Sequence, residues 1–309
     1  MSGRWLKKAG LFLLLLWAAA SLIFFLVHAL PGDPLLEILG PNPDPGDILR
    51  LRRQLQLDRP LAAQYARYIS RLAVLDLGES LVDHKPVRVT LWRYLPNTAL
   101  LALAAMGLTV PLALLLAIRS ASGENRLWAV LASAFTAVGL AVPAFLIGLI
   151  LILIFSLGLG IFPVSGCGGI EFLVLPAVTL ALPLGAFLTR LVRTVLRQEA
   201  RRPYVLLARA KGLSPAQVFR RHILKNTLVP IVTLVGMQAG ALLSGAIVVE
   251  SVFSWPGIGT LLVRAVRQRD FPVIQGAALL MVALFLLMNF LVDLAYPLLD
   301  PRIGHDRAG

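Results

Sequence analysis

Three ionisable side chains border long apolar runs in this 309-residue sequence and are the first candidates for chemistry: His28, Glu250 and Asp293. An ionisable group inside a membrane is costly and usually serves proton or ion transfer. Each of the three lies near the end of its run, and no acid or histidine lies in the middle of one. For His28 a position at the membrane interface is the better interpretation. For Glu250 and Asp293 the interfacial and functional interpretations are about equally supported.

Motifs of common enzyme classes are missing from the sequence. It contains no G-x-x-x-x-G-K-[ST] nucleotide loop, no H-E-x-x-H and no G-x-S-x-G. Its single cysteine, Cys167, excludes an intrachain disulfide and a cysteine-based zinc site. We therefore expect no catalytic residue, no metal site and no cofactor. A membrane-embedded enzyme, which would need a serine and a histidine at compatible depth, and an assembly protein without transport remain the alternatives to a transport protein.

The segment from Glu199 to Pro230 is predicted to form two helices separated by a tight stop. Gly212 suits the left-handed residue that ends a helix. Ser214 then fits an N-cap, Pro215 the first helical position and Gln217 the reciprocal cap. A plain basic loop and a docking element are both compatible with this composition. The segment also carries the basic side chains Arg220, Arg221, His222 and Lys225.

Two further patterns lie in and after the next apolar run. Small residues at helical spacing allow helices to approach closely, and ordinary packing is the simpler interpretation. A pathway-lining or subunit-facing role is the alternative, for which the candidates are Gly236, Gln238, Gly240, Ser244 and Glu250. The turn that follows is either an interfacial aromatic anchor or a shaped lip, formed by Trp255, Pro256 and Gly257.

The amino-acid composition indicates that these residues are positioned by membrane-spanning helices. The chain is 58% hydrophobic and 15% charged, whereas soluble domains are about 45–50% apolar and about 25% charged. This excludes a disordered chain and argues against an ordinary soluble enzyme. The net charge of +13 is better explained by sorting of membrane topology than by nucleic-acid binding.

Apolar runs long enough to cross a membrane predict an all-α polytopic protein, a six-helix bundle in a single domain over residues 1–309. The run 9–30 is too long for a signal peptide. The run 127–164 is interpreted as one span with a break near Pro143. Residues 31–95 form an extramembrane insertion with short amphipathic helices, either a layer on the bundle or a docking surface. The predicted spans are 9–30, 96–118, 127–164, 173–191, 229–249 and 273–296.

The distribution of Lys and Arg gives the orientation. With six spans, 17 of these residues lie on the side of both termini and 12 on the other. The positive-inside rule gives little weight to long loops such as residues 31–95. Without this segment the second count falls to three. Two spans in 127–164 would place the basic region 190–225 on the outside. We therefore expect both termini to be cytoplasmic and residues 31–95 to be periplasmic.

Short motifs follow one another in a fixed order along nearly the whole chain. In their order and residue types, these motifs resemble those of the inner-membrane permease subunits of binding-protein-dependent ABC importers, in the dipeptide, oligopeptide and nickel group. The motifs are Gly32-Asp33-Pro34; Leu57-Asp58-x-Pro60-Leu61 with Gln64-Tyr65; Asp76-Leu77-Gly78-x-Ser80; Pro86-Val87; Tyr204-x3-Ala208-Arg209-Ala210-Lys211-Gly212-Leu213; His222-x3-Asn226-x3-Pro230; Glu250-x2-Phe253-x-Trp255-Pro256-Gly257-x-Gly259; Arg269-Asp270-x-Pro272-Val273-x-Gln275-Gly276; Asn289-x2-Val292-Asp293; and Asp300-Pro301-Arg302.

This resemblance implies a type I importer permease fold and a cytoplasmic coupling loop over residues 194–228 that fits a cleft on the ATPase subunit. Leu206-Leu207-Ala208 departs from the Glu-Ala-Ala of the wider family, which puts one polar contact in doubt. The coupling-loop residues carried over are Tyr204, Ala208, Arg209, Ala210, Lys211, Gly212, Leu213, Asn226 and Pro230.

The resemblance also implies the partners and the mechanism. They are a paralogous permease as heterodimer partner, two ATP-binding cassette subunits, a periplasmic or lipid-anchored solute-binding protein, and the lipid of the inner membrane. ATP-driven closure of the ATPase subunits would move the coupling loops and open the bundle inward. Peptides are the favoured solute, with nickel or a nickel chelate as the alternative.

Overall fold

The computed structural model describes residues 2–29, 44, 46, 49–50, 53, 58–122 and 125–299, with side chains from residue 8 to 292. Its regular elements are helices, as predicted, and its described part contains one isolated β-bridge, between Glu79 and Pro86. Within the described residues, five helices are long and apolar enough to cross a membrane, or six if a bent pair counts as one span. Contacts divide the chain into a first unit, 1–99 with 256–286, and a second unit, 100–255 with 287–309.

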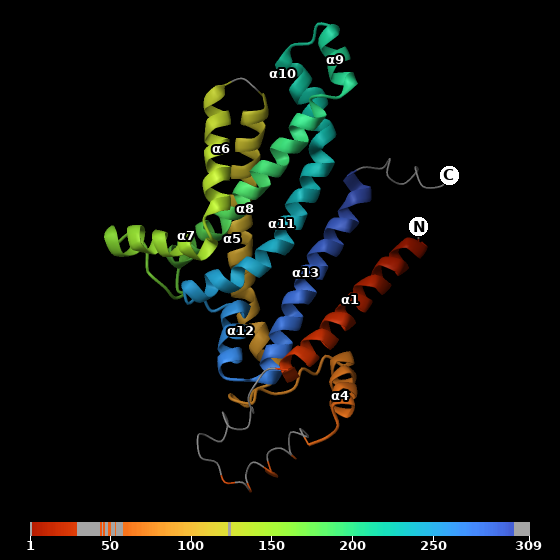
Figure 1. The fold of residues 1–309 in the computed structure, drawn as a ribbon, viewed down its shortest axis with the longest axis vertical. Coiled ribbons are helices and arrows are strands. Elements are labelled where there is room, and N and C mark those ends of the chain that lie inside the picture. Colours follow the sequence, from red (N-terminus) through yellow and green to blue (C-terminus); the bar gives the residue numbers. More distant parts are fainter. Residues whose placement is uncertain are drawn as a thin grey trace. The chain divides into compact units, whose positions relative to one another are not determined.

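The first unit contains α1 (Ser2–Ala29), α4 (Leu61–Ala73), the start of α5 (Val87–Ser122), α12 (Ile258–Arg267) and the start of α13 (Phe271–Leu299) (Figure 1). The predicted amphipathic helix after residue 60 is confirmed as α4, and it packs on α1 through aromatic rings. Phe25 stacks on Tyr65 with ring centroids 5.5 Å apart, and Phe24 on Tyr68 at 5.4 Å. Burial, with a smaller effect of Tyr65, raises the pKa of Tyr68 to about 12.

His28 is held by its neighbours within the first unit. Its Nε2 lies 3.2 Å from Oε1 of Gln64, and its Nδ1 lies 2.8 Å from the carbonyl oxygen of Phe24. Its ring also lies 4.1 Å from that of Phe24. These contacts agree with the structural interpretation of this histidine at the end of a span.

The second unit contains the rest of α5 and α13 and eight complete elements between them. These are α6 (Arg126–Ala141), α7 (Ala144–Leu151), the π-helix η1 (Ile152–Gly158), α8 (Ile170–Glu199), α9 (Pro203–Ala210), α10 (Pro215–Val218), the π-helix η2 (Phe219–Ile223) and α11 (Leu224–Val252), of which α10, η2 and α11 are continuous (Figure 1). Helix α8 is the centre of this unit, because both α6 and α11 pack along it.

The predicted break near Pro143 is confirmed, but α6 and the α7–η1 segment do not form one straight span. They meet at an angle of 103°. Val142, which precedes the proline, is extended with ψ 123°, and Pro143 begins the new helix at its N-cap. The cause is the steric clash of a proline ring with a helical residue before it.

Several predicted features lie outside the described residues. They are Gly32-Asp33-Pro34, the helix through Leu51 and Leu55, Leu57, and Asp300-Pro301-Arg302. The side chain of Asp293 is also outside the described set.

Candidate functional site

The stop between α9 and α10 has the geometry that the sequence predicts. Gly212 has a φ of +82°, and its N–H donates to the carbonyl of Arg209 at 2.9 Å. A Cβ on Gly212 would meet no atom within 4 Å, so its conformation, rather than space, requires glycine. Ser214 and Gln217 form a reciprocal capping box with Pro215 in the first turn. The chain is thereby fixed in a compact helix–turn–helix.

A buried apolar cluster supports this turn within the second unit. Val205 and Ala208 on α9 are buried, as is Val218 at the end of α10. They pack with Leu188, Val192 and Leu196 on α8, Phe219 and Ile223 on η2, and Ile231 on α11. The cluster therefore packs α9 and α10 directly against both long helices, α8 and α11.

Tyr204 ties the two ends of the segment together. Its hydroxyl lies 2.6 Å from Oε1 of Glu199 at the end of α8, and Asn226 on α11 donates to it from 3.0 Å. Arg202 contacts the same carboxylate at 3.6 Å. Burial, together with the hydrogen bond to Glu199, raises the pKa of Tyr204, so the phenol stays protonated and donates to the carboxylate at neutral pH.

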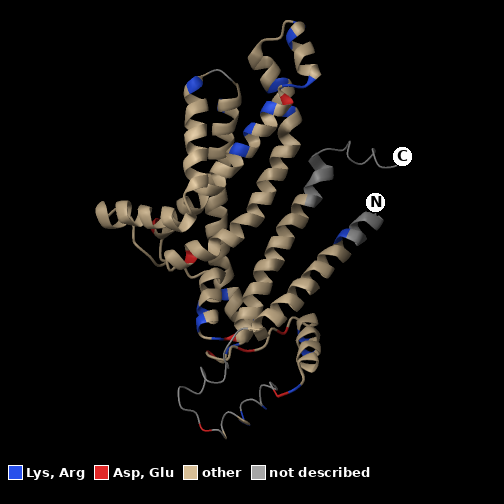
Figure 2. Cartoon of the chain, viewed as in Figure 1, with Lys and Arg blue, Asp and Glu red and all other residues tan. Residues whose placement is uncertain are grey.

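The outer surface of α9 and the turn is both apolar and basic. Leu206 and Leu207 are 62% and 58% exposed, an unusual position for leucine outside a membrane or an interface. Arg209, Ala210, Lys211 and Gly212 are also exposed, whereas Leu213 is half-buried. Figure 2 shows Lys and Arg gathered at the end of α8 and along this segment. Such a surface suits a partner that offers an apolar cleft with acidic edges.

We expect Tyr204→Phe to loosen this segment without unfolding the protein. The change removes the hydroxyl that Glu199 and Asn226 share, and one hydrogen bond to a charged group contributes about 1.5–3 kcal/mol. Hydrogen exchange of α9 amides should therefore be roughly tenfold or more faster, while exchange in the middle of α8 is unchanged. Equal exchange of α9 in both proteins would show that Tyr204 does not anchor the segment. Arg201→Gln, at an exposed residue in the turn between α8 and α9, serves as the control.

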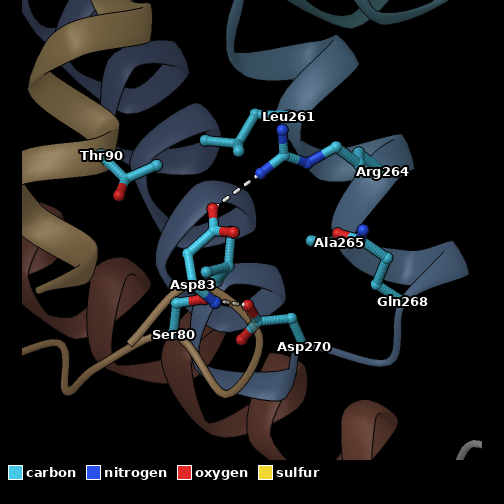
Figure 3. Close-up of a pocket in the computed structure, with 9 residues that line it drawn as sticks. Ser80, Asp83, Thr90, Leu261, Arg264, Ala265, Gln268 and Asp270 are labelled. Atoms are coloured by element: carbon cyan, nitrogen blue, oxygen red, sulfur yellow. Dashed lines mark hydrogen bonds and ion pairs between the residues drawn. The ribbon is translucent and has the colours of Figure 1, made fainter. Parts of the chain in front are cut away.

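In the first unit, two separated motifs meet in a buried polar cluster (Figure 3). Ser80 donates to Oδ2 of Asp270 at 2.5 Å, and the Leu81 N–H donates to Oδ1 at 3.1 Å. Ser80 and Asp270 are both 3% exposed. Asp83 and Arg264 form a half-exposed ion pair of 2.9 Å above them. The cluster fixes the loop before α5 against the turn between α12 and α13.

The predicted lip residues are positioned by polar side chains of α5 that lie outside the predicted sites. Asn97 donates to the Pro256 carbonyl at 2.8 Å, and Thr98 Oγ1 accepts the Ile258 N–H at 2.8 Å. Gly257 is the N-cap of α12, with extended backbone. These contacts hold the start of α12 inside the first unit.

Trp255 is not exposed as an interfacial anchor would be, because only 1% of its surface is accessible. It belongs to a buried cluster of the second unit that contains Phe253, Leu180 and Leu242. The N–H of Trp255 donates to the carbonyl of Glu250 at 2.8 Å, and Glu250 is itself fully buried. The aromatic turn is therefore part of the core at this end of the unit.

The small residues of α11 mediate helix packing in the second unit. A Cβ on Gly236 would clash with Val292 of α13, and one on Gly245 would lie 3.5 Å from Leu180 of α8. Gln238 is buried and donates to the Leu184 carbonyl of α8 at 3.1 Å. Gly240 is buried, whereas Ser244 is exposed.

Some residues of these sites were not predicted from the sequence. The short motifs named above do not include Glu199, Asn97 or Thr98, so only the hydrogen bonds of these residues reveal their roles. Ser80 and Asp270 do lie in motifs, but their sequence separation of 190 residues concealed their pairing. Pro230, a predicted coupling-loop residue, lies exposed within α11.

Comparisons with known proteins cover nearly the whole chain. Residues 109–305 match the family model "Binding-protein-dependent transport system inner membrane component". Residues 4–102 match the model for the N-terminal part of the membrane component of such systems. The glutathione transport system permease protein GsiC of Salmonella paratyphi A is 40% identical over 287 residues, 93% of this chain and 94% of that protein. GsiC of Escherichia coli strain K12 is 39% identical over 290 residues, 94% of this chain and 95% of that protein.

Proposed function

Because this chain belongs to the family of inner membrane components of binding-protein-dependent transport systems, we propose that it forms half of a translocation pathway for short peptides of the size of glutathione. The chain is a multi-pass permease subunit of an ABC importer, not an enzyme. ATP hydrolysis and solute capture belong to separate ATPase and solute-binding subunits.

The proposal for the solute is supported by the names of the relatives. GsiC of Salmonella typhimurium LT2, a glutathione permease, is 39% identical over 287 residues, 93% of this chain and 94% of that protein. Glutathione is a tripeptide, so it falls within the peptide class favoured by the motifs. Nickel or a nickel chelate is the alternative that the experiment must separate.

The segment of residues 194–228 is proposed as the loop that couples ATP hydrolysis to the bundle. The observation that carries this proposal is the exposed pair Leu206 and Leu207 beside Arg209 and Lys211. The turn that presents them packs on the buried apolar cluster of α8, η2 and α11. Rigid support matters because a flexible loop would absorb the motion of the ATPase. In the assembly these leucines would fill an apolar cleft of the ATPase subunit.

We also propose a cytoplasmic position for this segment and for both termini. Ser133 on α6 contacts Arg193 on α8, and Gly139 packs on Ala186, so these helices are antiparallel and the start of α6 lies at the α9 end of α8. Arg119 and Arg126 therefore share an end of the second unit with the basic region 190–225. Positive charge favours the cytoplasmic side. A paralogous permease is proposed as the second half of the pathway.

Transport by the complete complex tests the solute. The tagged chain is purified from native membranes with its partners, reconstituted in liposomes, and supplied with the solute-binding protein of the same system. We expect ATP-dependent uptake of labelled glutathione and of dipeptides, and none of nickel ions. Uptake of nickel alone would overturn the peptide proposal. A complex with an inactivated ATPase is the control.

A further inference from the structure

Three arginines lie on one side of the last turns of α8. Arg190, Arg193 and Arg197 are separated by three and four residues, the spacing that places side chains above one another on a helix. Arg190 and Arg197 are exposed, but only 9% of Arg193 is accessible. A buried arginine is rare without a carboxylate or another anion beside it.

The guanidinium of Arg193 is only partly satisfied. Its Nη1 donates to Oγ of Ser133 on α6 at 3.2 Å. Its Nε is buried and has no hydrogen-bond partner among the described residues. Unsatisfied buried donors are rare in native structures, and a bound anion is one arrangement that would satisfy this one. The free Nε edge is the one that binds carboxylates and phosphates in a fork.

The acidic side chains described in the second unit do not supply this ligand. Glu199 bonds to Tyr204 and Arg202. Glu171 precedes Arg193 by 22 residues on α8, about 33 Å along the helix at a rise of 1.5 Å per residue. Glu250 is at the opposite end of the unit, because Gln238 and Gly245 of α11 contact Leu184 and Leu180 of α8 in antiparallel order.

The parts of α6 and α8 that contain Ser133 and Arg193 also carry exposed apolar side chains, as a lipid-facing surface does. Leu127, Val130 and Leu131 on α6 and Phe187 on α8 are large apolar side chains that are 43–57% exposed. Arg193 lies six residues before the end of α8, about 9 Å along the axis. The Trp128 ring, with Arg119 5.5 Å from its centroid, lies toward the same end of α6, where interfacial tryptophans are enriched.

We propose that Arg190, Arg193 and Arg197, with Ser133, bind the phosphate of an anionic phospholipid of the cytoplasmic leaflet. The inference rests on the proposed orientation of the chain, which places this end of α8 in that leaflet. The buried Arg193 fork holds the phosphate, and the two exposed arginines add charge. The lipid tails lie along the exposed apolar side chains of α6 and α8. The anionic character of this leaflet provides the ligand at high local concentration.

Lipid retention by the complete complex tests the site. Wild-type and variant complexes are placed in nanodiscs of phosphatidylcholine with a minor share of phosphatidylglycerol, and the lipids that stay bound are counted by native mass spectrometry. Arg193→Gln should retain phosphatidylglycerol roughly tenfold less, as expected for one charge-assisted hydrogen bond lost. Arg193→Lys should fall between, because it keeps the charge without the fork. Arg88→Gln, an exposed arginine of the first unit, is the matched control.

A double variant covers the case in which Arg193→Gln does not assemble. Arg190→Gln with Arg197→Gln changes only exposed side chains and should reduce phosphatidylglycerol retention severalfold. Retention equal to wild type in either variant overturns the lipid site. So does loss of glutathione uptake with unchanged retention, since the arginines would then act on the solute or on a partner. Loss of retention with uptake of peptides preserved supports the lipid site and leaves the transport assignment intact.

Discussion

Gly212→Val should abolish solute uptake while leaving the chain inserted and assembled with its partners. The φ of +82° at this residue costs an L-amino acid about 1–2 kcal/mol, and β-branching raises the penalty further. The turn then opens, and Arg209 and Lys211 leave the positions from which they would contact the ATPase. Uptake by reconstituted complexes should fall at least tenfold, because the turn no longer couples the ATPase to the helices while the helices themselves stay folded.

Gly212→Asn is the matched variant for this experiment. Asparagine adopts left-handed backbone far more readily than valine, and open space surrounds the missing Cβ. We expect it to keep most of the uptake. Wild-type uptake by the valine variant would refute the coupling role of the turn. Equal loss in both variants would show that side-chain size against the ATPase, rather than backbone conformation, is the constraint.

Asp270→Ala should destabilise the first unit more than any change at an exposed residue of that unit. The carboxylate accepts hydrogen bonds from Ser80 and from the Leu81 N–H while being 3% exposed. Hydrogen bonds to a charged group contribute about 1.5–3 kcal/mol each, and truncation leaves Ser80 buried without its acceptor. The melting temperature of the purified complex should fall by several degrees, with a lower yield from membranes.

Asp83→Asn is the control from the same cluster. Its ion pair with Arg264 is about half exposed, and such pairs contribute about 0–1 kcal/mol. Its melting temperature should therefore stay close to wild type. If Asp270→Ala melts like Asp83→Asn, the buried cluster does not hold the loop of residues 76–86 in place.

Most of the helices follow from the sequence, because apolar runs of membrane length admit few other structures. The α9–α10 turn could be predicted residue by residue, since Gly212, Ser214, Pro215 and Gln217 each have a strong local preference. The 103° angle after α6 could not, because Pro143 specifies that a helix breaks but not the direction in which it resumes.

Side-chain partners that are distant in sequence account for the remaining differences. Trp255 resembles an interfacial anchor in sequence, yet the apolar cluster around it buries the ring. The importance of Asp270 depends on Ser80, 190 residues earlier, and no periodicity links the two. Arg193 likewise counts as one more positive charge in the sequence, and only its burial in the structure distinguishes it from Arg190 and Arg197.

The most direct test of the account is site-specific photocrosslinking from the outer surface of α9. A photoreactive amino acid replaces Leu207, which is 58% exposed, and the complex is irradiated in native membranes. We predict a covalent adduct with the ATPase subunit. The yield of this adduct should fall when the complex is trapped with ATP in a different conformation. The same amino acid at Leu75, 76% exposed after α4, should give no such adduct. Absence of the adduct from Leu207, or its appearance only with the solute-binding protein, would contradict the coupling assignment and the orientation of the chain.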